Sequence, residues 1–217
     1  MKRPAVKSPP GPWNELVTRA RQSGEAVVTL KGVYRVWHGG RELLESFVAA
    51  PGPIGWRYFG RVHPPDSEEE LFTVDHVVDA EWGLVRYRLL DQSGTSIVAT
   101  LATGGIEVVT GRPGEERSET VPGASAVWSS SPCSLLVVDR LLGTSGRSDV
   151  AAVLIGAALD PEVITVRLQR RGSRPVVTPA GNSEAELVEV MLDGERFEAL
   201  IHSDLPLSAR GWFDLVA

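Results

Sequence analysis

Apolar residues recur with a period of two through most of the chain from Glu25 onward. Leu30, Tyr34 and Val36 share one parity, while charged residues such as Arg35 fall between them. This alternation is typical of strands with one buried face, and turn residues recur about every ten residues, as in an antiparallel meander. The expected strands span residues 25–37, 42–49, 54–62, 72–80, 84–90, 96–101, 106–110, 163–169, 175–179, 185–192 and 196–202.

Two other segments have the spacing of helices. Residues 12–24 place apolar side chains at i, i+3, i+4 and i+7 from Trp13, which predicts a short helix with one buried stripe. Ser131 at the N-cap, Pro132 at the first helical position and Gly143 just past the end predict a second helix. Capping also explains the run of serines that ends at Ser131.

The apolar segment from Val150 to Leu159 fits either a buried helix capped by Ser148 or a buried strand. The whole pattern predicts a mainly β fold of the α+β class. We expect one large curved antiparallel sheet or half-barrel of roughly 10–12 strands with two or three helices, one of them packed on the concave face. Residues 1–10 are expected to form a flexible tail, and residues 11–217 a single curved-sheet domain.

Composition narrows the range of partners. The chain has 217 residues with 42% hydrophobic and 23% charged residues, as in a folded domain, and its net charge of −6 argues against nucleic-acid binding. No segment is apolar enough for a membrane span or a secretory signal, so we expect a cytoplasmic protein. The single cysteine, Cys133, excludes an internal disulfide, and no pair of histidines has chelating spacing. We therefore expect no metal and no cofactor.

The later part of the chain has a recognisable order of features. A long meander is followed by a serine–proline helix start, an Asp–Arg–Leu helix end, further strands and a short aromatic tail. These features occupy Ser131-Pro132, Asp139-Arg140-Leu141, residues 159–169, the 185–201 hairpin with its Asp193-Gly194 turn, and Trp212-Phe213. In this order they resemble the glycolipid-binding proteins of bacteria and, more distantly, the lipoprotein-carrier superfamily with its spiral half-barrel sheet.

The resemblance implies a hydrophobic groove between the curved sheet and a helix, suited to an acyl or polyketide-like chain. By strand parity, Tyr34, Trp56, Tyr58 and Tyr87 are candidates for lining such a groove. Tyrosine and tryptophan combine an apolar ring with one polar group, which suits the binding of an amphipathic molecule. Ordinary core packing is the alternative explanation for each of these four residues.

Three residues are candidates for catalysis. Cys133 lies at the start of the second predicted helix, where the helix dipole lowers a thiol pKa, although a lone buried cysteine is usually inert. Asp75 and Asp79 share one face of the 72–81 strand with Glu81, and an enclosed pair of carboxyls can act as acid and base. On a solvent face the same carboxylates would only keep the protein soluble.

Three functions are compatible with these features. The first is the binding of a hydrophobic or amphipathic small molecule, lipid-like or polyketide-like, in a groove between sheet and helix. The second is an enzyme, a cyclase or isomerase of bacterial secondary metabolism that holds a polyketide-type chain in the same groove. The third is a partner-binding module that uses the apolar 150–159 segment as its interface.

Overall fold

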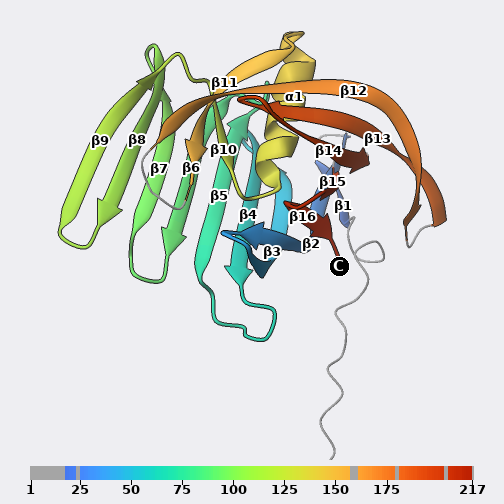
Figure 1. The fold of residues 1–217 in the computed structure, drawn as a ribbon, viewed down its shortest axis with the longest axis horizontal. Helices are drawn as coiled ribbons and strands as arrows, with labels where there is room; N and C mark the ends of the chain where they lie inside the picture. The colour runs from blue at the N-terminus through green and yellow to red at the C-terminus, as the bar shows by residue number, and fades with distance from the viewer. Residues whose placement is uncertain (1–17, 23–24, 157–160, 179–180, 203–204, 217) are drawn as a thin grey trace, which may run out of the picture.

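The computed structural model describes residues 18–22, 25–156, 161–178, 181–202 and 205–216. Within these ranges the chain forms sixteen strands and one helix, α1, which spans Cys133–Ser145 (Figure 1). The strands are β1 (Thr18–Gln22), β2 (Glu25–His38), β3 (Arg41–Gly52), β4 (Gly55–His63), β5 (Phe72–Asp79), β6 (Leu84–Asp91), β7 (Ser96–Ala102), β8 (Gly105–Arg112), β9 (Glu115–Pro122), β10 (Ala126–Ser129), β11 (Asp149–Ile155), β12 (Glu162–Thr178), β13 (Gly181–Leu192), β14 (Glu195–His202), β15 (Leu205–Ala209) and β16 (Phe213–Leu215).

The strands form one open sheet. Its order is β10-β11-β12-β13-β14-β15-β16-β2-β3-β4-β5-β6-β7-β8-β9, and β1 pairs with β2 beside this path. Strand β16 pairs with β2, so the last described strand lies beside one of the first. Among the described strands only β10 and β11 pair in parallel, and α1 supplies the crossover that a parallel pair requires. The sheet curves around the helix (Figure 1).

The α+β class expected from the sequence is wrong, because the fold is nearly all β. The described residues form one helix instead of two or three, and sixteen strands instead of roughly 10–12. The described part of the helix expected at 12–24 is strand β1, which pairs antiparallel with the first half of β2. Hydrogen bonding to a neighbouring strand outweighs a short helical period, since an isolated short helix is marginal. The rest of that segment, like the tail at 1–10, lies outside the described residues.

Two further differences concern strands. The first half of the ambiguous 150–159 segment is strand β11, which lies between β10 and β12, while residues 157–160 lie outside the described residues. Strand β9 was not expected, because its charged sequence shows no apolar alternation. It is mostly exposed at the end of the sheet, where charged side chains protect an open edge.

The turn predictions are confirmed at two hairpins. Gly39 and Gly40 separate β2 from β3, and His38 pairs with Arg41 across the turn. Between β13 and β14, Asp193 and Gly194 both have positive φ angles, 42° and 97°. A type I′ turn requires positive φ at both central residues, and its twist matches that of the strands.

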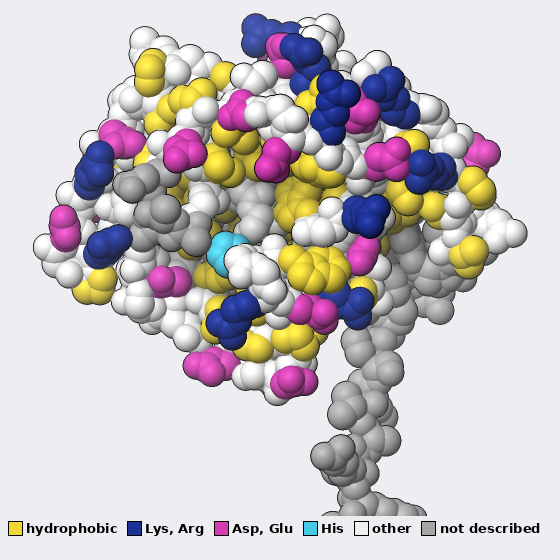
Figure 2. Space-filling model, viewed as in Figure 1, with side chains coloured by type: hydrophobic (Ala, Val, Ile, Leu, Met, Phe, Trp, Pro, Cys, Tyr) yellow, Lys and Arg dark blue, Asp and Glu magenta, His cyan; other side chains and the backbone are white. Residues whose placement is uncertain are grey.

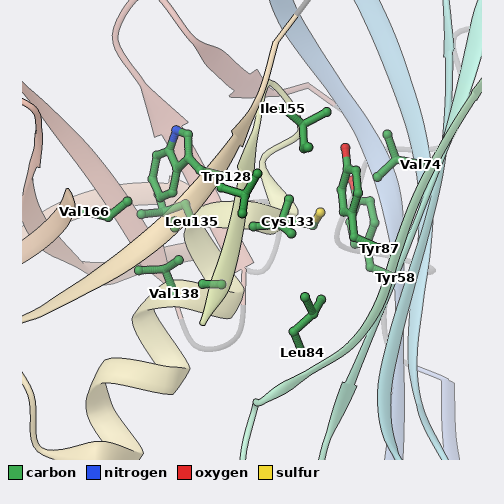
Figure 3. Close-up of a cluster of buried hydrophobic side chains, with 14 of the residues drawn as sticks. Tyr58, Val74, Leu84, Tyr87, Trp128, Cys133, Leu135, Val138, Ile155 and Val166 are labelled. Carbon is green, nitrogen blue, oxygen red and sulfur yellow. The ribbon is translucent and has the colours of Figure 1, made fainter. Parts of the chain in front are cut away.

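Helix α1 is enclosed from its first turn. Leu135, Leu136, Val137 and Val138 are each at most 2% exposed, as in a helix that is apolar on every side. Leu135 and Val138 lie toward Val166 of β12, on the opposite side from the concave faces of β4, β5 and β6 (Figure 3). The helix ends at Gly146, with a left-handed φ of 67° and its N–H donating to the carbonyl of Leu142, three residues later than predicted. At 13 residues, α1 is too short to cross a membrane.

Candidate functional site

A carboxylate lies in the core under the start of α1. Glu45 follows the buried parity of β3, between Leu43 and Phe47, and is 1% exposed. The hydroxyl groups of Tyr58 and Ser131 both donate to its Oε1, at 2.7 and 2.6 Å. Within the described residues this carboxylate forms no ion pair, so two neutral donors, one from β4 and one from the approach to α1, hold it.

Gly60 provides the space that this carboxylate occupies. A Cβ atom at Gly60 would lie 2.5 Å from Oε1 of Glu45 and 3.1 Å from Cε1 of Tyr58. The first distance is shorter than a carbon atom tolerates, and the second is a tight contact that would require Tyr58 to shift slightly. The glycine on β4 therefore allows the charged side chain of β3 to lie flat against the sheet beneath the helix.

The same cluster contains a thiol and an imidazole. Sγ of Cys133 is 3.3 Å from Oγ of Ser131 and 3.6 Å from Nδ1 of His76. His76 is on β5 with 1% exposure, and its ring meets the ring of Tyr87 on β6 edge to face, with 5.3 Å between centroids. The Cys133 sulfur is directed from the start of α1 toward Tyr58 and Tyr87 (Figure 3). We call Glu45, Tyr58, His76, Tyr87, Ser131 and Cys133 the buried polar cluster.

Burial governs the protonation of these groups. It raises the pKa of Glu45 from 4.5 to about 7, although the hydrogen bonds from Ser131 and Tyr58 act in the opposite direction. It lowers the pKa of His76 from 6.5 to about 4, so the imidazole is neutral at pH 7. It also raises the pKa of Cys133, which is opposite to the helix-dipole effect expected from the sequence. The thiol is therefore protonated and is a weak nucleophile in this state.

An aromatic groove of ≈ 500 Å³ opens beside the cluster. The rings of Trp128 and Trp212 lie 5.0 Å apart, and Phe197 meets Trp212 edge to face at 5.7 Å. The indole N–H of Trp212 donates to the carbonyl of Ser130 at 2.7 Å, which fixes the ring beside the approach to α1. We define the aromatic groove by these three rings, with Trp37, Leu154 and Ile155 also at its border.

Two arginines, Arg196 and Arg210, and one exposed carboxylate, Glu195, border the groove, so its border carries a net positive charge. Both arginines are exposed, and neither forms an ion pair within the described part of the chain. Ser129 lines the groove as well, although it is only 3% exposed, and its Oγ accepts a hydrogen bond from the N–H of Ser131 at 3.3 Å. Ser129 therefore separates the aromatic groove from the buried polar cluster.

The sequence-predicted ligand residues occupy two places. Tyr34, Tyr58 and Tyr87 are at most 2% exposed on the concave face of the sheet. Phe47 stacks on both Tyr34 and Tyr58, with centroid distances of 4.9 and 5.3 Å. Trp56 is apart from them and packs against Trp82, at 5.3 Å. Tyr58 and Tyr87 thus belong to the buried polar cluster, whereas Trp56 does not.

The two aspartate candidates have separate surroundings. Asp75 accepts hydrogen bonds from Nε of Arg57 at 2.7 Å and from a terminal nitrogen of Arg86 at 2.6 Å. It lies on the face of β5 opposite to His76, as neighbours on a strand do. Asp79 accepts hydrogen bonds from backbone N–H groups of the turn that follows β5. Both carboxylates therefore stabilise local structure.

Glu45 and His76 were not identified as site residues from the sequence, which predicted only a capping role for Ser131. The alternation of side chains along a strand could have identified Glu45 and His76. Each is the one polar residue among alternate positions that are otherwise apolar, at 43, 45, 47 and 49 and at 74, 76 and 78. A polar residue at a core parity position needs a partner, which only the fold identifies. Within the described ranges, no group of three or more His, Cys, Asp or Glu side chains is arranged to hold a metal ion.

Comparison of this chain with known protein families, with curated proteins and with solved structures finds no match. The resemblance to glycolipid-binding and lipoprotein-carrier proteins therefore stays a hypothesis based on the order of elements.

Proposed function

We propose that this protein binds an amphipathic small molecule with a long apolar chain and an acidic head. The apolar chain lies in the aromatic groove, and the head lies near Arg196 and Arg210. The observation that carries the proposal is the combination of three packed aromatic rings with two arginines at one open groove of ≈ 500 Å³. This volume is within the range of small-molecule sites, about 300–1,000 Å³.

The two parts of the groove make different contributions. Each methylene group buried against the rings contributes about 0.8 kcal/mol, so chain length dominates affinity. The arginines are exposed, and each contributes about 0.2–1 kcal/mol that salt screens. They select an anionic head over a cationic one and orient the chain in the groove. The face of the molecule drawn in Figure 2 shows apolar side chains exposed among interspersed basic and acidic ones.

The ligand class is the one expected from the sequence, and the proposed place is the opening beside Ser129 and Ser130, which lead into α1. The test is a calorimetric titration of dodecanoate and dodecylammonium at low salt. Dodecanoate should bind more tightly, and its binding should change the tryptophan fluorescence, because Trp128 and Trp212 lie in the groove. If neither amphiphile binds, the proposal fails.

Matched variants locate the site. Phe197→Ala should weaken dodecanoate binding, whereas Phe59→Ala, a half-buried phenylalanine on another face, should not. The double variant Arg196→Gln/Arg210→Gln should weaken dodecanoate binding by about two- to thirty-fold at low salt and leave dodecylammonium binding no weaker. If Trp56→Ala weakens binding and Phe197→Ala does not, the ligand lies at the Trp56–Trp82 pair instead.

One observation favours the enzyme as a second candidate function. A buried carboxyl with a pKa of about 7 is suited to acid–base chemistry near neutral pH, and Glu45 is such a group. As an isomerase or cyclase, the protein would use Glu45 to take a proton from a carbon next to a carbonyl group. In that case the protein should catalyse deuterium exchange into a long-chain ketone in D₂O, and Glu45→Gln should abolish the exchange.

The apolar segment of the partner-binding hypothesis contributes to the chain's own core. Val150, Ala152, Val153 and Ile155 of β11 are at most 5% exposed. These four side chains are buried in the core, so they cannot form an interface with a partner protein.

A further inference from the structure

Two polar atoms of the buried polar cluster have no hydrogen-bond partner. Nε2 of His76 and the hydroxyl of Tyr87 are both buried and unpaired within the described part of the chain. The two side chains are 1% and 0% exposed, and the residues are paired directly across β5 and β6. A buried polar group without a partner costs about 1–3 kcal/mol. Two such groups on side chains whose rings are in contact are unusual for a core that packs only against itself.

The hydrogen-bond chain fixes which of these atoms donate. Ser131 has one hydroxyl proton, which it donates to Glu45 at 2.6 Å. The protonated thiol of Cys133 is then free to donate to Nδ1 of His76, the stronger acceptor of its two neighbours. In a neutral imidazole whose Nδ1 accepts, the proton is on Nε2. His76 therefore presents one N–H donor and Tyr87 one O–H donor, and neither donor has an acceptor.

The groove lies next to these donors. Ser129 lines the aromatic groove, and its side chain is close enough to donate a hydrogen bond to the ionised oxygen of Tyr87, which opposes the rise of the Tyr87 pKa that burial causes. The proton of the neutral Tyr87 hydroxyl still has no acceptor. The Ser129 hydroxyl is itself bonded to Ser134, at 2.9 Å. Neither Tyr87 nor His76 lines the groove itself, so a ligand chain reaches their donors only by displacing the buried Ser129 side chain.

We propose that the two donors of His76 and Tyr87 form a buried site, called here the carbonyl site, that binds a carbonyl oxygen on the apolar chain of the ligand. The inference rests on the proposed function, and it adds a substrate class: chains that carry a ketone, ester or thioester carbonyl. A carbonyl oxygen has two lone pairs for two donors and no charge. A carboxylate at this site would be repelled by Glu45, which is joined to His76 through Ser131 and Cys133.

The test compares two neutral probes of equal length, 2-nonanone and nonane. The ketone should bind more tightly by about two- to twelve-fold per hydrogen bond gained. Tyr87→Phe should remove much of this advantage, with no loss of affinity for nonane or dodecanoate. The matched control is Tyr34→Phe, which removes a hydroxyl bonded to the carbonyl of Pro206 and should leave the preference for the ketone intact. The infrared carbonyl band of bound ¹³C-labelled 2-nonanone should move to higher wavenumber in Tyr87→Phe.

A structural role of Tyr87 gives a different result. If its hydroxyl only supported the fold, Tyr87→Phe would lower the stability of the free protein, whereas removal of an unpaired hydroxyl should leave stability unchanged or higher. Equal affinities for ketone and alkane, or a carbonyl band that Tyr87→Phe does not move, would overturn the inference. So would a crystal structure of the ketone complex with water retained between His76 and Tyr87. If dodecanoate binds in these cases, only the proposal of a carbonyl site is wrong. If no probe binds, the proposed function and the carbonyl site are both wrong.

Discussion

The hydroxyl of Ser131 donates a 2.6 Å hydrogen bond to the carboxylate of Glu45, 86 residues earlier in the chain. The sequence suggested a different use for this hydroxyl, as the N-cap of α1. In the structure α1 begins after Pro132 without a side-chain cap, and the hydroxyl is directed into the core. This bond joins the approach to the helix to β3 and leads, through Cys133, to His76.

Glu45 and His76 should affect stability with opposite dependence on pH. The pKa of Glu45 is raised from 4.5 to about 7, so its contribution to the free energy of unfolding is complete below pH 4.5 and is lost as pH rises toward 7. The pKa of His76 is lowered from 6.5 to about 4, so its contribution is complete above pH 6.5 and is lost as pH falls toward 4. Each shift corresponds to about 3 kcal/mol, and the two effects largely cancel between pH 4.5 and 6.5.

Single variants should separate these effects in denaturant unfolding from pH 4 to 8. In His76→Gln the free energy of unfolding should fall as pH rises through this range, relative to the wild type. In Glu45→Gln it should rise with pH instead. Glu69→Gln, in an exposed loop, is the control and should follow the wild-type curve. Parallel curves for all four proteins would mean that neither buried group changes its protonation on folding.

Ser131→Ala and Tyr58→Phe should each destabilise the protein by about 1–3 kcal/mol, because each leaves a buried carboxylate with one donor fewer. Each should also raise the pKa of Glu45 further, which can be followed by ¹³C NMR of the labelled carboxyl group. The matched control is Ser118→Ala, since Ser118 donates to Glu107 at an exposed position and should change stability by less than about 0.5 kcal/mol. If Ser118→Ala and Ser131→Ala destabilised the protein equally, burial of the carboxylate would not be the cause of the loss.

Gly60→Ala should destabilise the protein through Glu45, because the new Cβ atom would lie 2.5 Å from Oε1. In the background of Glu45→Ala the same substitution should cost much less, and a double-mutant cycle measures this coupling. Gly52→Ala is the control, since the nearest atom to its Cβ would be at 3.9 Å. The interpretation fails if the cost of Gly60→Ala is the same with and without the Glu45 side chain.

Asp75→Asn should have a small effect on stability and none on dodecanoate affinity. Its partners Arg57 and Arg86 are 56% and 46% exposed, so the lost ion pairs are worth about 0.2–1 kcal/mol each. The side chain is also on the opposite face of β5 from His76. Calorimetric titration and denaturant unfolding of the same preparation test both statements. A large loss of ligand affinity in Asp75→Asn would mean that Asp75 contributes to the ligand site.

Part of the site could be predicted from the sequence. The alternation that defines the strands placed Tyr34, Tyr58 and Tyr87 on one face, and all three are buried there. It could not identify Trp128 or Phe197, because the aromatic groove is made from β10, β14 and the turn before β16, which are distant in sequence. The face of a residue follows from local periodicity, whereas its neighbours depend on which strands pair.

The sequence by itself determined the strand periodicity, the hairpin turns and the parity of the buried side chains, because a pleated backbone imposes these on each segment locally. Only the tertiary structure decided that residues 18–22 and 149–155 are strands, since pairing with β2 and with β10 and β12 selected that conformation. It also decided the chemistry of the interior. Glu45 shares the face of Leu43 and Phe47 and is buried wherever they are, but the curvature of the sheet and the crossover through α1 brought Ser131 within hydrogen-bond distance of it.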